Sequence, residues 1–412
     1  MQACNEVKMA VTGTITTKFV DEKGVDLGRQ LVEKDYLISV YPNLVPQMQT
    51  PNLLVWGDNQ YGALGQNNDV TISSPVQTIL RSNNWRAVAA HKHTGMIKND
   101  GTLWMTGFNP FGAIGDNTTV FAISSPVQTI AGGTNWNQVG CGYYHTSATK
   151  KDGTLWCWGY NGYGQLGTNN ITNVSSPIQV VGAATNWVQT ACGYYFTGGR
   201  KTDGTLWFWG RNNNGQLGDN TSGFANNRSS PVQTAAIGTN WTTFACGWFH
   251  TAAIKADGTL WTWGNNYNGQ LGDNTRIHRS SPVQTVTGGT NWKQVSCGSG
   301  HTAAIKTDGT LWAWGVNYGN LGDNTSTRKS SPVQTVAATT NWKQVACGNG
   351  GTYAIKTDGT LWVWGNNSFG QAGTNNATTA FSSPVQTFGG GNTWKLVVAG
   401  RLNTFAIRDA NY

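Results

Sequence analysis

The stretch Asp257-Gly258-Thr259-Leu260-Trp261-Thr262-Trp263-Gly264, running on to Gly269-Gln270-Leu271-Gly272, recurs in related versions along most of the chain. The position of Trp263, always followed by Gly, repeats at intervals of 50 to 54 residues, at Trp56, Thr106, Trp158, Trp209, Trp263, Trp314 and Trp364. A Ser-Ser-Pro motif repeats in step and ends at Pro75, Pro126, Pro177, Pro231, Pro282, Pro332 and Pro384. A further Trp, usually after Asn, recurs at Trp85, Trp136, Trp187, Trp241, Trp292, Trp342 and Trp394. Three markers with seven copies each and a period near 50 indicate an array of seven similar supersecondary units.

The composition and charge fit an array of short strands and exclude several classes of partner. Of 412 residues, 54 are Gly and 20 are Trp, and only 11% are charged. This much apolar surface disfavours disorder. After residue 50 the chain has 22 Lys or Arg against 13 Asp, and no basic run exceeds two residues, so we expect no nucleic acid partner. The chain shows neither the apolar core of a signal peptide nor an apolar run near ~20 residues, so we expect no membrane insertion.

Each unit supplies four extended segments, which in the fifth unit are residues 260–264, 282–286, 292–297 and 302–306. A turn such as Asp308-Gly309 follows the fourth segment, and Asp-Gly between apolar runs predicts a hairpin with a two-residue type I′ turn. Such a turn has positive φ at both central residues. The fourth segment of one unit should therefore pair with the first segment of the next.

This offset predicts how the array closes. The first segment, residues 53–57, has no Asp-Gly partner before it, and the last segment, residues 404–408, has none after it. Joining them completes one blade from residues 394–399 and 404–408 of one end and residues 53–57 and 75–78 of the other. We predict an all-β fold: a seven-bladed β-propeller of four-stranded blades, closed by pairing the N- and C-terminal strands, with a small N-terminal extension.

Residues 1–50 differ from the repeats and hold all three Glu of the chain. Three apolar residues alternate with polar ones and predict a strand: Val11, Ile15 and Phe19. From about residue 26 to residue 40, Leu27, Leu31 and Ile38 have roughly helical spacing, although Gly28 weakens a helix. The segment is too small to build much of a core. We therefore expect an N-terminal anchor or docking segment, residues 1–50, ahead of a propeller domain, residues 51–412.

The units resemble the repeats of the regulator of chromosome condensation family, which combine Asp-Gly, Leu-Trp-x-Trp-Gly, a Gly-Gln-Leu-Gly loop and His-Thr. Matching stretches include residues 164–167, residues 215–218 and His301-Thr302, and the resemblance extends over residues 53–408. It departs locally, with Thr106 in place of Trp and with Ile114 and Ala372 in place of Leu. The resemblance implies a seven-bladed propeller. The member that gives the family its name catalyses nucleotide exchange on a small GTPase and binds chromatin, but this chain shows no basic tail and no matching exchange residue.

The repeats do not show the cluster of unusual acids, bases or nucleophiles that an active site needs. Twelve of the 13 acids after residue 50 lie at or near recurrent turns, where an acid is a structural residue. Four His precede Thr in the repeat, and other units have Phe196, Gly351 or Asn403 there; the four are His93, His145, His250 and His301. Shared catalytic machinery would not tolerate Phe or Gly. We predict a non-enzymatic protein with no catalytic residues, metal or cofactor.

Five cysteines occupy one equivalent position just before Gly, where the first and last units have Ala90 and Ala399; they are Cys141, Cys192, Cys246, Cys297 and Cys347. A position that accepts Cys or Ala is most simply a small buried apolar slot. A ring of disulfides or of metal-binding thiolates is the alternative interpretation.

The link between the third and fourth segments is the best candidate for a binding site, because its side chains change while the framework stays fixed. Three successive units place aromatic pairs there: Tyr143 and Tyr144, Tyr194 and Tyr195, and Trp248 and Phe249. Tyr and Trp suit protein contacts or stacking on sugar rings, although packing between blades would also explain them. A second surface consists of basic loop residues that we interpret as solvated rather than nucleic-acid-binding: Arg211, Arg228, Arg276, Arg279, Arg328 and Lys329.

These features favour a non-enzymatic structural and interaction module that binds a protein partner through residues 1–50 and the propeller loops. Near-identical repeats behind a short anchor-like segment resemble propeller-bearing structural proteins of bacteriophage virions. That resemblance implies a virion surface or tail-appendage protein that recognises a host surface, a glycan or another virion protein, and that forms homo-oligomers within an assembly. The alternatives are an exchange-factor-like regulator of a small GTPase and a glycan-processing appendage.

Overall fold

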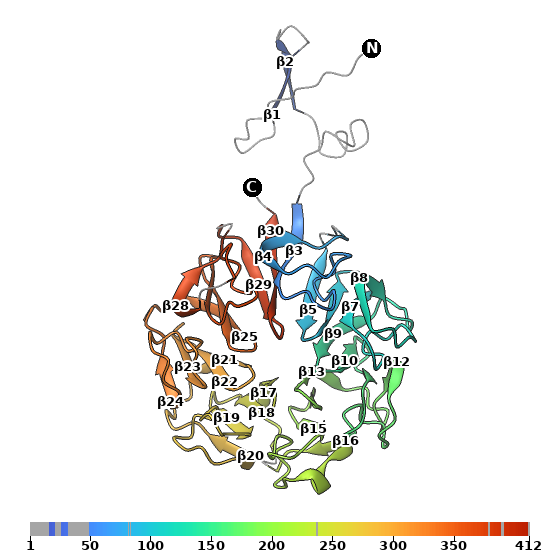
Figure 1. The fold of residues 1–412 in the computed structure, drawn as a ribbon, viewed down its shortest axis with the longest axis vertical. Helices are drawn as coiled ribbons and strands as arrows, with labels where there is room; N and C mark the ends of the chain where they lie inside the picture. The colour runs from blue at the N-terminus through green and yellow to red at the C-terminus, as the bar shows by residue number, and fades with distance from the viewer. Residues whose placement is uncertain are drawn as a thin grey trace. The chain divides into compact units, whose positions relative to one another are not determined.

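The structure is a computed structural model that describes residues 16–20, 26–31, 49–80, 82, 84–235, 238–377, 380–388 and 391–410. The chain divides into two compact units: Met1–Gln49 with Asn411–Tyr412, and Thr50–Ala410. In the first unit, β1 (Thr16–Val20) and β2 (Asp26–Leu31) form an antiparallel pair. The second unit is a ring of seven four-stranded antiparallel sheets, which confirms the predicted propeller (Figure 1).

Six blades are formed by consecutive strands, and in each the first strand lies nearest the propeller axis. Blade 1 contains β5 (Trp85–Ala90), β6 (His93–Lys98), β7 (Leu103–Phe108) and β8 (Ala122–Gln128). Blade 2 contains β9 (Trp136–Cys141), β10 (His145–Lys150), β11 (Leu155–Gly159) and β12 (Val174–Gln179). Blade 3 contains β13 (Trp187–Cys192), β14 (Phe196–Lys201), β15 (Leu206–Gly210) and β16 (Arg228–Gln233), with a short 3-10 helix at Phe224–Asn226.

Blade 4 contains β17 (Trp241–Cys246), β18 (His250–Lys255), β19 (Leu260–Gly264) and β20 (Arg279–Gln284). Blade 5 contains β21 (Trp292–Cys297), β22 (His301–Lys306), β23 (Leu311–Gly315) and β24 (Lys329–Gln334). Blade 6 contains β25 (Trp342–Cys347), β26 (Gly351–Lys356), β27 (Leu361–Gly365) and β28 (Phe381–Gln386). The predicted second segment of the fifth unit, residues 282–286, overlaps β20 of blade 4, which begins three residues earlier, at Arg279, and ends at Gln284.

Blade 7 joins the two ends of the repeat array. Its strand order is β29 (Trp394–Ala399), β30 (Asn403–Ala410), β3 (Gln49–Gly57) and β4 (Ile72–Gln77). The predicted closure by N- and C-terminal strands is therefore confirmed. Closure pairs the backbone edges that β30 and β3 would otherwise leave open.

The Asp-Gly turns do connect the second strand to the third in blades 1 to 6, but the predicted type I′ geometry is wrong. In blade 1 the backbone N–H of Gly101 donates to the oxygen of Lys98 at 2.9 Å, so Asn99 and Asp100 are the central residues. Positive φ belongs to Gly101 alone, at 84°, which is the pattern of a longer hairpin loop ending in a left-handed Gly. The carboxylate of Asp100 accepts hydrogen bonds from the backbone N–H and the hydroxyl of Thr102, and these bonds hold the longer loop.

The roughly helical spacing from about residue 26 does not correspond to a helix where the structure describes it, because Asp26–Leu31 is a strand. Gly28 disfavours a helix, and antiparallel pairing with Thr16–Val20 satisfies the backbone of the segment instead. The predicted strand lies partly in β1, through Phe19, whereas Val11 and Ile15 lie outside the described residues, as does Ile38. In the part of the chain that the structure describes, no helix is long and apolar enough to cross a membrane.

The core lies between neighbouring blades, and the recurrent tryptophans fill it. The indoles of Trp263 and Trp241 are fully buried and meet edge to face with ring centroids 6.2 Å apart. The Nε1 of Trp263 and the hydroxyl of Thr251 both donate to the backbone oxygen of Gln216 in the preceding blade, at 3.0 Å each. Where Thr106 replaces this Trp, its hydroxyl donates to the oxygen of Gly62 at 3.0 Å. The repeated motif is therefore the joint between blades.

Candidate interaction face

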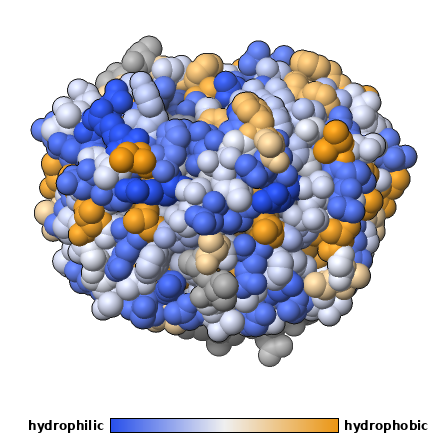
Figure 2. Space-filling model, turned by 90° about the horizontal axis from the view of Figure 1, so that it is seen from below, coloured by the Kyte–Doolittle hydropathy of each residue, from blue (hydrophilic) through white to orange (hydrophobic). Residues whose placement is uncertain are grey.

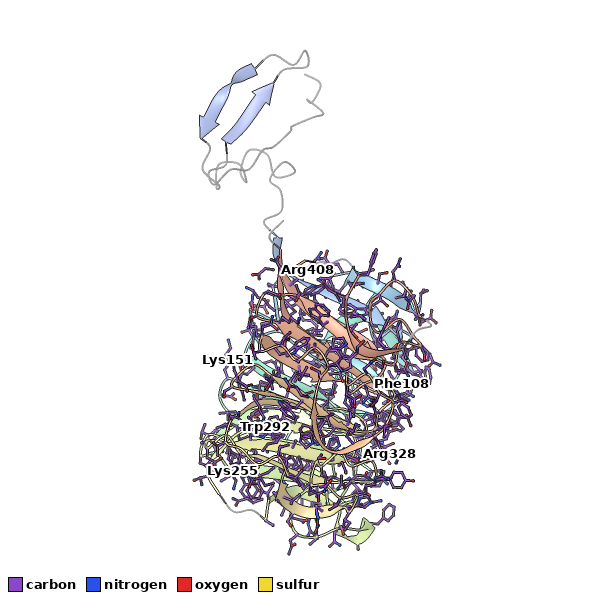
Figure 3. The ribbon with its side chains drawn as sticks, turned by 90° about the vertical axis from the view of Figure 1, so that its left-hand side faces the viewer. Phe108, Lys151, Lys255, Trp292, Arg328 and Arg408 are labelled. Carbon is purple, nitrogen blue, oxygen red and sulfur yellow. The ribbon has the colours of Figure 1, made fainter. Side chains whose placement is uncertain are left out.

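The two faces of the propeller carry different loops because neighbouring strands run in opposite directions. The links from the first to the second strand of a blade and from the third to the fourth emerge on one face, which we call the link face. The Asp-Gly turns emerge on the other, the hairpin face. In Figure 3, Phe108 and Arg328 lie on the link side of the propeller and Lys151 and Lys255 on the hairpin side.

Six predicted site residues form one continuous cluster on the link face, which we call the aromatic patch: Tyr143, Tyr144, Tyr194, Tyr195, Trp248 and Phe249. All six are half-buried. The ring of Tyr143 in blade 2 stacks on Tyr194 in blade 3, with centroids 4.0 Å apart and planes inclined by 17°. Tyr194 continues the contact to Trp248 in blade 4 at 5.0 Å. The structure thus brings all six together, packed on each other across three blades and still partly exposed.

The backbone of the links holds this arrangement in register. The N–H of Tyr143 donates to the oxygen of Tyr194 at 3.2 Å, and the N–H of Tyr194 donates to the oxygen of Trp248 at 3.1 Å. The same chain of bonds continues through the links of the other blades and returns from Arg401 to the oxygen of His91 at 3.4 Å. Each aromatic pair therefore stands on a backbone ring around the propeller axis, in which only the step from blade 1 to blade 2 has no such bond among the described residues.

The sequence interpretation missed further members of the cluster. The third strands of blades 1, 2 and 7 and the links that follow them add six residues that contact one another or the patch: Tyr61, Phe108, Phe111, Phe121, Tyr160 and Tyr163. The signal was present in the sequence, since residues such as Phe111 and Tyr163 immediately precede the Gly of the Gly-Gln-Leu-Gly-type loop. The topology, which places both kinds of link on one face, was needed to combine them.

Two cations are enclosed by these rings. The Nζ of Lys92, from the blade 1 link, lies 4.4 Å from the ring centroid of Tyr143 and 4.9 Å from that of Phe108. Tyr61 and Tyr144 complete its surroundings at 5.3 and 5.1 Å. The guanidinium of Arg211 lies between 5.4 and 5.9 Å from four further rings: Tyr163, Tyr195, Phe224 and Phe249. Cation–π attraction of this kind stabilises a partly desolvated charge by about 1–2 kcal/mol.

The electrostatics of the patch follow from burial and from Lys92. Burial alone would raise the pKa of Tyr143, but interactions with Lys92, Tyr144 and Tyr194 together outweigh it and lower that pKa to about 8. Burial raises the pKa of Tyr195 to about 12, so this hydroxyl stays protonated at neutral pH. The patch therefore offers phenol donors, apolar ring faces and a positive charge side by side.

The patch occupies one side of the link face only. Ser299 and Gly300 in blade 5, and Asn349 and Gly350 in blade 6, stand at the equivalent positions and offer little apolar surface. Elsewhere the exposed apolar side chains are more scattered; Figure 2, which views the propeller edge-on, shows them as separate spots among hydrophilic residues. The links between first and second strands are therefore aromatic on one side of the ring, whereas the links between third and fourth strands also carry exposed rings in blades 5 and 6, at Tyr318 and Phe369.

The five equivalent cysteines surround the propeller axis, and Cys141, Cys297 and Cys347 are buried there among apolar neighbours, as the sequence predicted. Together with Ala90 and Ala399 the five cysteines line an axial cavity of about 80 Å³, beside His91 and Trp248. All five are free thiols, and burial raises the pKa of each; that of Cys192 and Cys347 rises to about 12. Within the described residues, no group of three or more His, Cys, Asp or Glu is placed to hold a metal ion.

The repeated histidines join neighbouring blades. The Nε2 of His145 lies 3.0 Å from the hydroxyl of Thr197 in the next blade, and the same bond recurs at His93, His250 and His301. Burial lowers the pKa of His93, His145 and His250 to about 3 and that of His301 to about 4, so all four are neutral at pH 7. In blade 6, where Gly351 replaces His, the side chain of Tyr353 is buried and its hydroxyl lies beside Thr404.

Most of the basic loop residues form ion pairs or contact other side chains. Arg228 and Arg279 form ion pairs with Asp219 and Asp273 at 2.9 and 2.8 Å, and Lys329 lies 3.7 Å from Asp323. Arg211 packs among rings, Arg328 is 3.5 Å from the side-chain oxygen of Asn268, and Arg276 is exposed. The loops therefore do not present the free basic stripe that phosphate binding requires.

Comparison with known proteins follows the repeat pattern. The sequence matches the RCC1-like domain over residues 185–411 and the regulator of chromosome condensation (RCC1) repeat over residues 52–97 and 152–199. The chain belongs to the RCC1-like family. A further RCC1 repeat match covers residues 136–165.

This RCC1-like chain is similar in sequence to proteins that carry different names. It is 33% identical over 233 residues to the ultraviolet-B receptor UVR8 of Arabidopsis thaliana, which covers 55% of this chain and 52% of UVR8. It is 27% identical over 317 residues to the X-linked retinitis pigmentosa GTPase regulator homolog of Caenorhabditis elegans, covering 64% of this chain and 22% of that protein. The chain thus spans about half or less of the length of these relatives.

Solved structures confirm the fold. Human WBSCR16 superposes with a TM-score of 0.77 at 21% identity, covering 88% of this chain and 100% of that one. Prp20p of Saccharomyces cerevisiae, described with its binding to Gsp1p and histones, gives 0.77 at 18% identity, covering 88% and 92%. At these identities the likeness concerns the fold alone.

Proposed function

We propose that this RCC1-like propeller is an interaction module that binds a protein partner on the aromatic patch of the link face. The observation that carries the proposal is the continuous, one-sided cluster of half-exposed rings from Tyr143 to Phe249. Clustered Tyr and Trp side chains that are already fixed by their neighbours lose little conformational entropy on binding, which makes them strong anchors of protein interfaces.

The family supports a protein partner rather than a reaction. Prp20p is described with binding properties toward Gsp1p and histones, and yeast RCC1 (Prp20) with Kap60 bound. The relatives named above include no virion protein, so the interpretation as a virion or tail protein remains a prediction without support from them. Regulation of a GTPase is the alternative function, and the name of the C. elegans relative is the observation that favours it.

The test replaces Tyr143, Tyr194 and Trp248 together by Ala in the full-length chain. Proteins that co-purify with the wild-type chain are identified by mass spectrometry, and their affinity for the triple variant is measured. We expect a loss of at least tenfold, since truncation of each anchor residue costs about 1–2 kcal/mol or more. Unchanged affinity in a variant that keeps its melting temperature would remove the patch from consideration.

The matched control is the double variant Ser299→Ala, Asn349→Ala. These residues occupy the same link position in blades 5 and 6, so the control tests the same backbone ring without touching the patch. It should bind like the wild type. The same assay distinguishes a glycan: binding to a glycan array that the triple variant loses, without any protein partner, would replace the protein by a sugar ligand.

We also propose that residues 1–50 are a docking segment separate from the propeller. Deleting them should leave a propeller that unfolds cooperatively but no longer assembles with the partner of that segment. The measurement is thermal unfolding followed by circular dichroism, together with size-exclusion chromatography. Loss of cooperative unfolding would show instead that the segment belongs to the propeller core.

A further inference from the structure

A small pocket lies on the link face where the blade 7 link meets the blade 1 link, and we call it the anion pocket. The side chains that matter in its lining are those of Asp58, Gln60, His91, Lys92 and Arg401. Its volume is about 10 Å³, which is room for about one oxygen-sized atom. It adjoins the aromatic patch, because His91 lies 5.3 Å from Tyr143 between ring centroids.

Among the described residues, buried donors without partners outnumber buried acceptors without partners around this pocket, where the Oδ1 of Asn403 is the acceptor that lacks a partner. His91 is only 8% exposed, and within the described structure neither of its ring nitrogens has a hydrogen-bond partner. The Nε of Arg401 is buried and likewise lacks a partner there. Buried polar groups are normally hydrogen-bonded, and an unmade bond costs about 1–3 kcal/mol. The free protein therefore holds buried donor groups that an incoming acceptor can satisfy.

The charge of the pocket is positive. Lys92 is only 9% exposed, its Nζ reaches the hydroxyl of Tyr144 at 3.4 Å, and it forms no ion pair among the described residues. Lysine is rarely this buried unless it is paired. Asp58 is the one carboxylate in the lining, and its Oδ1 accepts the backbone N–H of Gln60 at 3.1 Å rather than a cation. The two positive charges of Lys92 and Arg401 thus exceed the single negative charge of Asp58.

We infer that the anion pocket receives a carboxylate of the protein partner, so that the partner presents an acidic side chain next to the apolar residues that cover the aromatic patch. One carboxylate oxygen fills the available volume and accepts from His91, Lys92 and Arg401. Charge-assisted hydrogen bonds of this kind are short and about twice as strong as neutral ones. The inference rests on the proposed function, since it specifies the chemistry of the same partner.

Burial and the neighbouring charges agree with this chemistry. Burial, followed by His93, Arg401 and Lys92, lowers the pKa of His91 well below its usual value. In the free protein His91 is therefore neutral and donates from one nitrogen. A bound carboxylate offsets the repulsion from Arg401 and Lys92, so it stabilises the donors that the free pocket leaves unmatched.

The test measures fluorescence anisotropy of a labelled peptide of alternating leucine and glutamate, added to the full-length chain. Two companion peptides carry glutamine or phosphoserine in place of glutamate. We expect saturable binding of the glutamate peptide and at least tenfold weaker binding of the glutamine peptide. Equal binding of glutamate and glutamine peptides overturns the inference, and a clear preference for phosphoserine also overturns it, because the pocket is then a phosphate site.

Variants assign the binding to the pocket. Lys92→Met keeps the stem among the rings and removes the charge, and Arg401→Gln removes a second charge; each should weaken the glutamate peptide at least tenfold. Asp58→Asn should strengthen it several-fold, because the one repelling carboxylate is gone. Lys343→Met, an exposed lysine on β25, is the matched control and should change nothing. Thermal melting checks that every variant folds, and wild-type affinity in folded Lys92→Met and Arg401→Gln overturns the inference.

The co-purified partner separates this inference from the proposed function. If the Tyr143, Tyr194 and Trp248 triple variant loses the partner while Lys92→Met and Arg401→Gln keep it, the carboxylate inference fails and the proposed function stands. If all of these variants keep the partner, both fail. If all of them lose it, both are supported.

Discussion

The indole Nε1 of Trp56 donates a hydrogen bond of 2.8 Å to the backbone oxygen of Gln371, a residue 315 positions further along the chain. The hydroxyl of Thr404 donates to the same oxygen at 2.8 Å. Trp56 lies on β3 and Thr404 on β30, which come from opposite ends of the repeat array and pair in blade 7. Both side chains therefore bind the same loop of blade 6. The same joint holds the other pairs of blades except blades 7 and 1, where Thr106 replaces the Trp.

Closure predicts that the last strand is needed for the whole propeller. Deleting residues 403–412 removes β30 and leaves β29 and β3 without their partner in blade 7. We expect loss of the single cooperative unfolding transition, measured by urea denaturation, because the ring then has two open strand edges. Deleting residues 411–412 alone is the control and should preserve it. A wild-type transition in the longer deletion would show that closure is dispensable.

The buried histidines predict a stability that depends on pH. Burial lowers the folded pKa of His250 to about 3, so below the unfolded value of about 6.5 the unfolded chain binds one more proton than the folded one. This contribution is complete above pH 6.5 and is lost as the pH falls toward 3. His250→Phe, which copies Phe196 of blade 3, should reduce the loss of stability between pH 7 and pH 5 by about 2 kcal/mol. Urea denaturation at both pH values measures it, and an unchanged difference would contradict burial of a neutral His250.

Substitutions at two glycines allow the cost of backbone strain to be measured apart from the cost of a steric clash. Gly309, in an Asp-Gly turn, has φ +78°, and an added Cβ would lie 2.1 Å from the oxygen of Thr340. Gly288 has φ +52° and nothing within 4 Å. Gly288→Ala should cost about 1–2 kcal/mol from its left-handed backbone, and Gly309→Ala at least about 2 kcal/mol more. Chemical denaturation compares the two, and equal costs would mean that the turn can move away from Thr340.

We predict that Tyr353 compensates in blade 6 for the absence of the repeated His. Its buried hydroxyl lies beside Thr404, where four of the other blades use His, so Tyr353→Phe should lower the free energy of unfolding by about 1–2 kcal/mol. Tyr267→Phe removes an exposed hydroxyl and should cost nothing measurable. Thermal denaturation of both variants decides this. A harmless Tyr353→Phe would show that Thr404 is held by Gln371 alone.

The axial thiols predict slow chemical modification. Burial raises the pKa of Cys141, Cys297 and Cys347, so little thiolate forms at pH 8. Peptide mass spectrometry after brief iodoacetamide treatment should find these residues unmodified in the folded protein and alkylated in urea. Rapid labelling of the folded protein would show that the axial cavity opens to solvent.

Much of the fold could be predicted because the repeat is local and strong. The pairing of second with third strands followed from Asp-Gly between apolar runs, and the makeup of blade 7 followed from the unpaired segments at each end. The turn type did not follow, because two central residues with negative φ and a left-handed Gly101 satisfy the same dipeptide. The strand at residues 26–31 did not follow either, because its pairing with residues 16–20 is not a local property.

The candidate site could be predicted only in part. Tyr143, Tyr194 and Trp248 were visible because the links vary between units that otherwise agree. The sequence did not show that these rings stack, that they enclose Lys92, or that His91 and Arg401 converge. Almost the whole repeat array lies between His91 and Arg401 along the chain, and only closure of the ring brings them together.

By itself, the sequence determined the blade, because hairpins and alternating apolar residues act over short distances along the chain. Only the tertiary structure decided the surface. Closing the ring places the last link beside the first, and a face built from seven separate loops acquires its rings, its donors and its charge only when all seven blades stand around one axis.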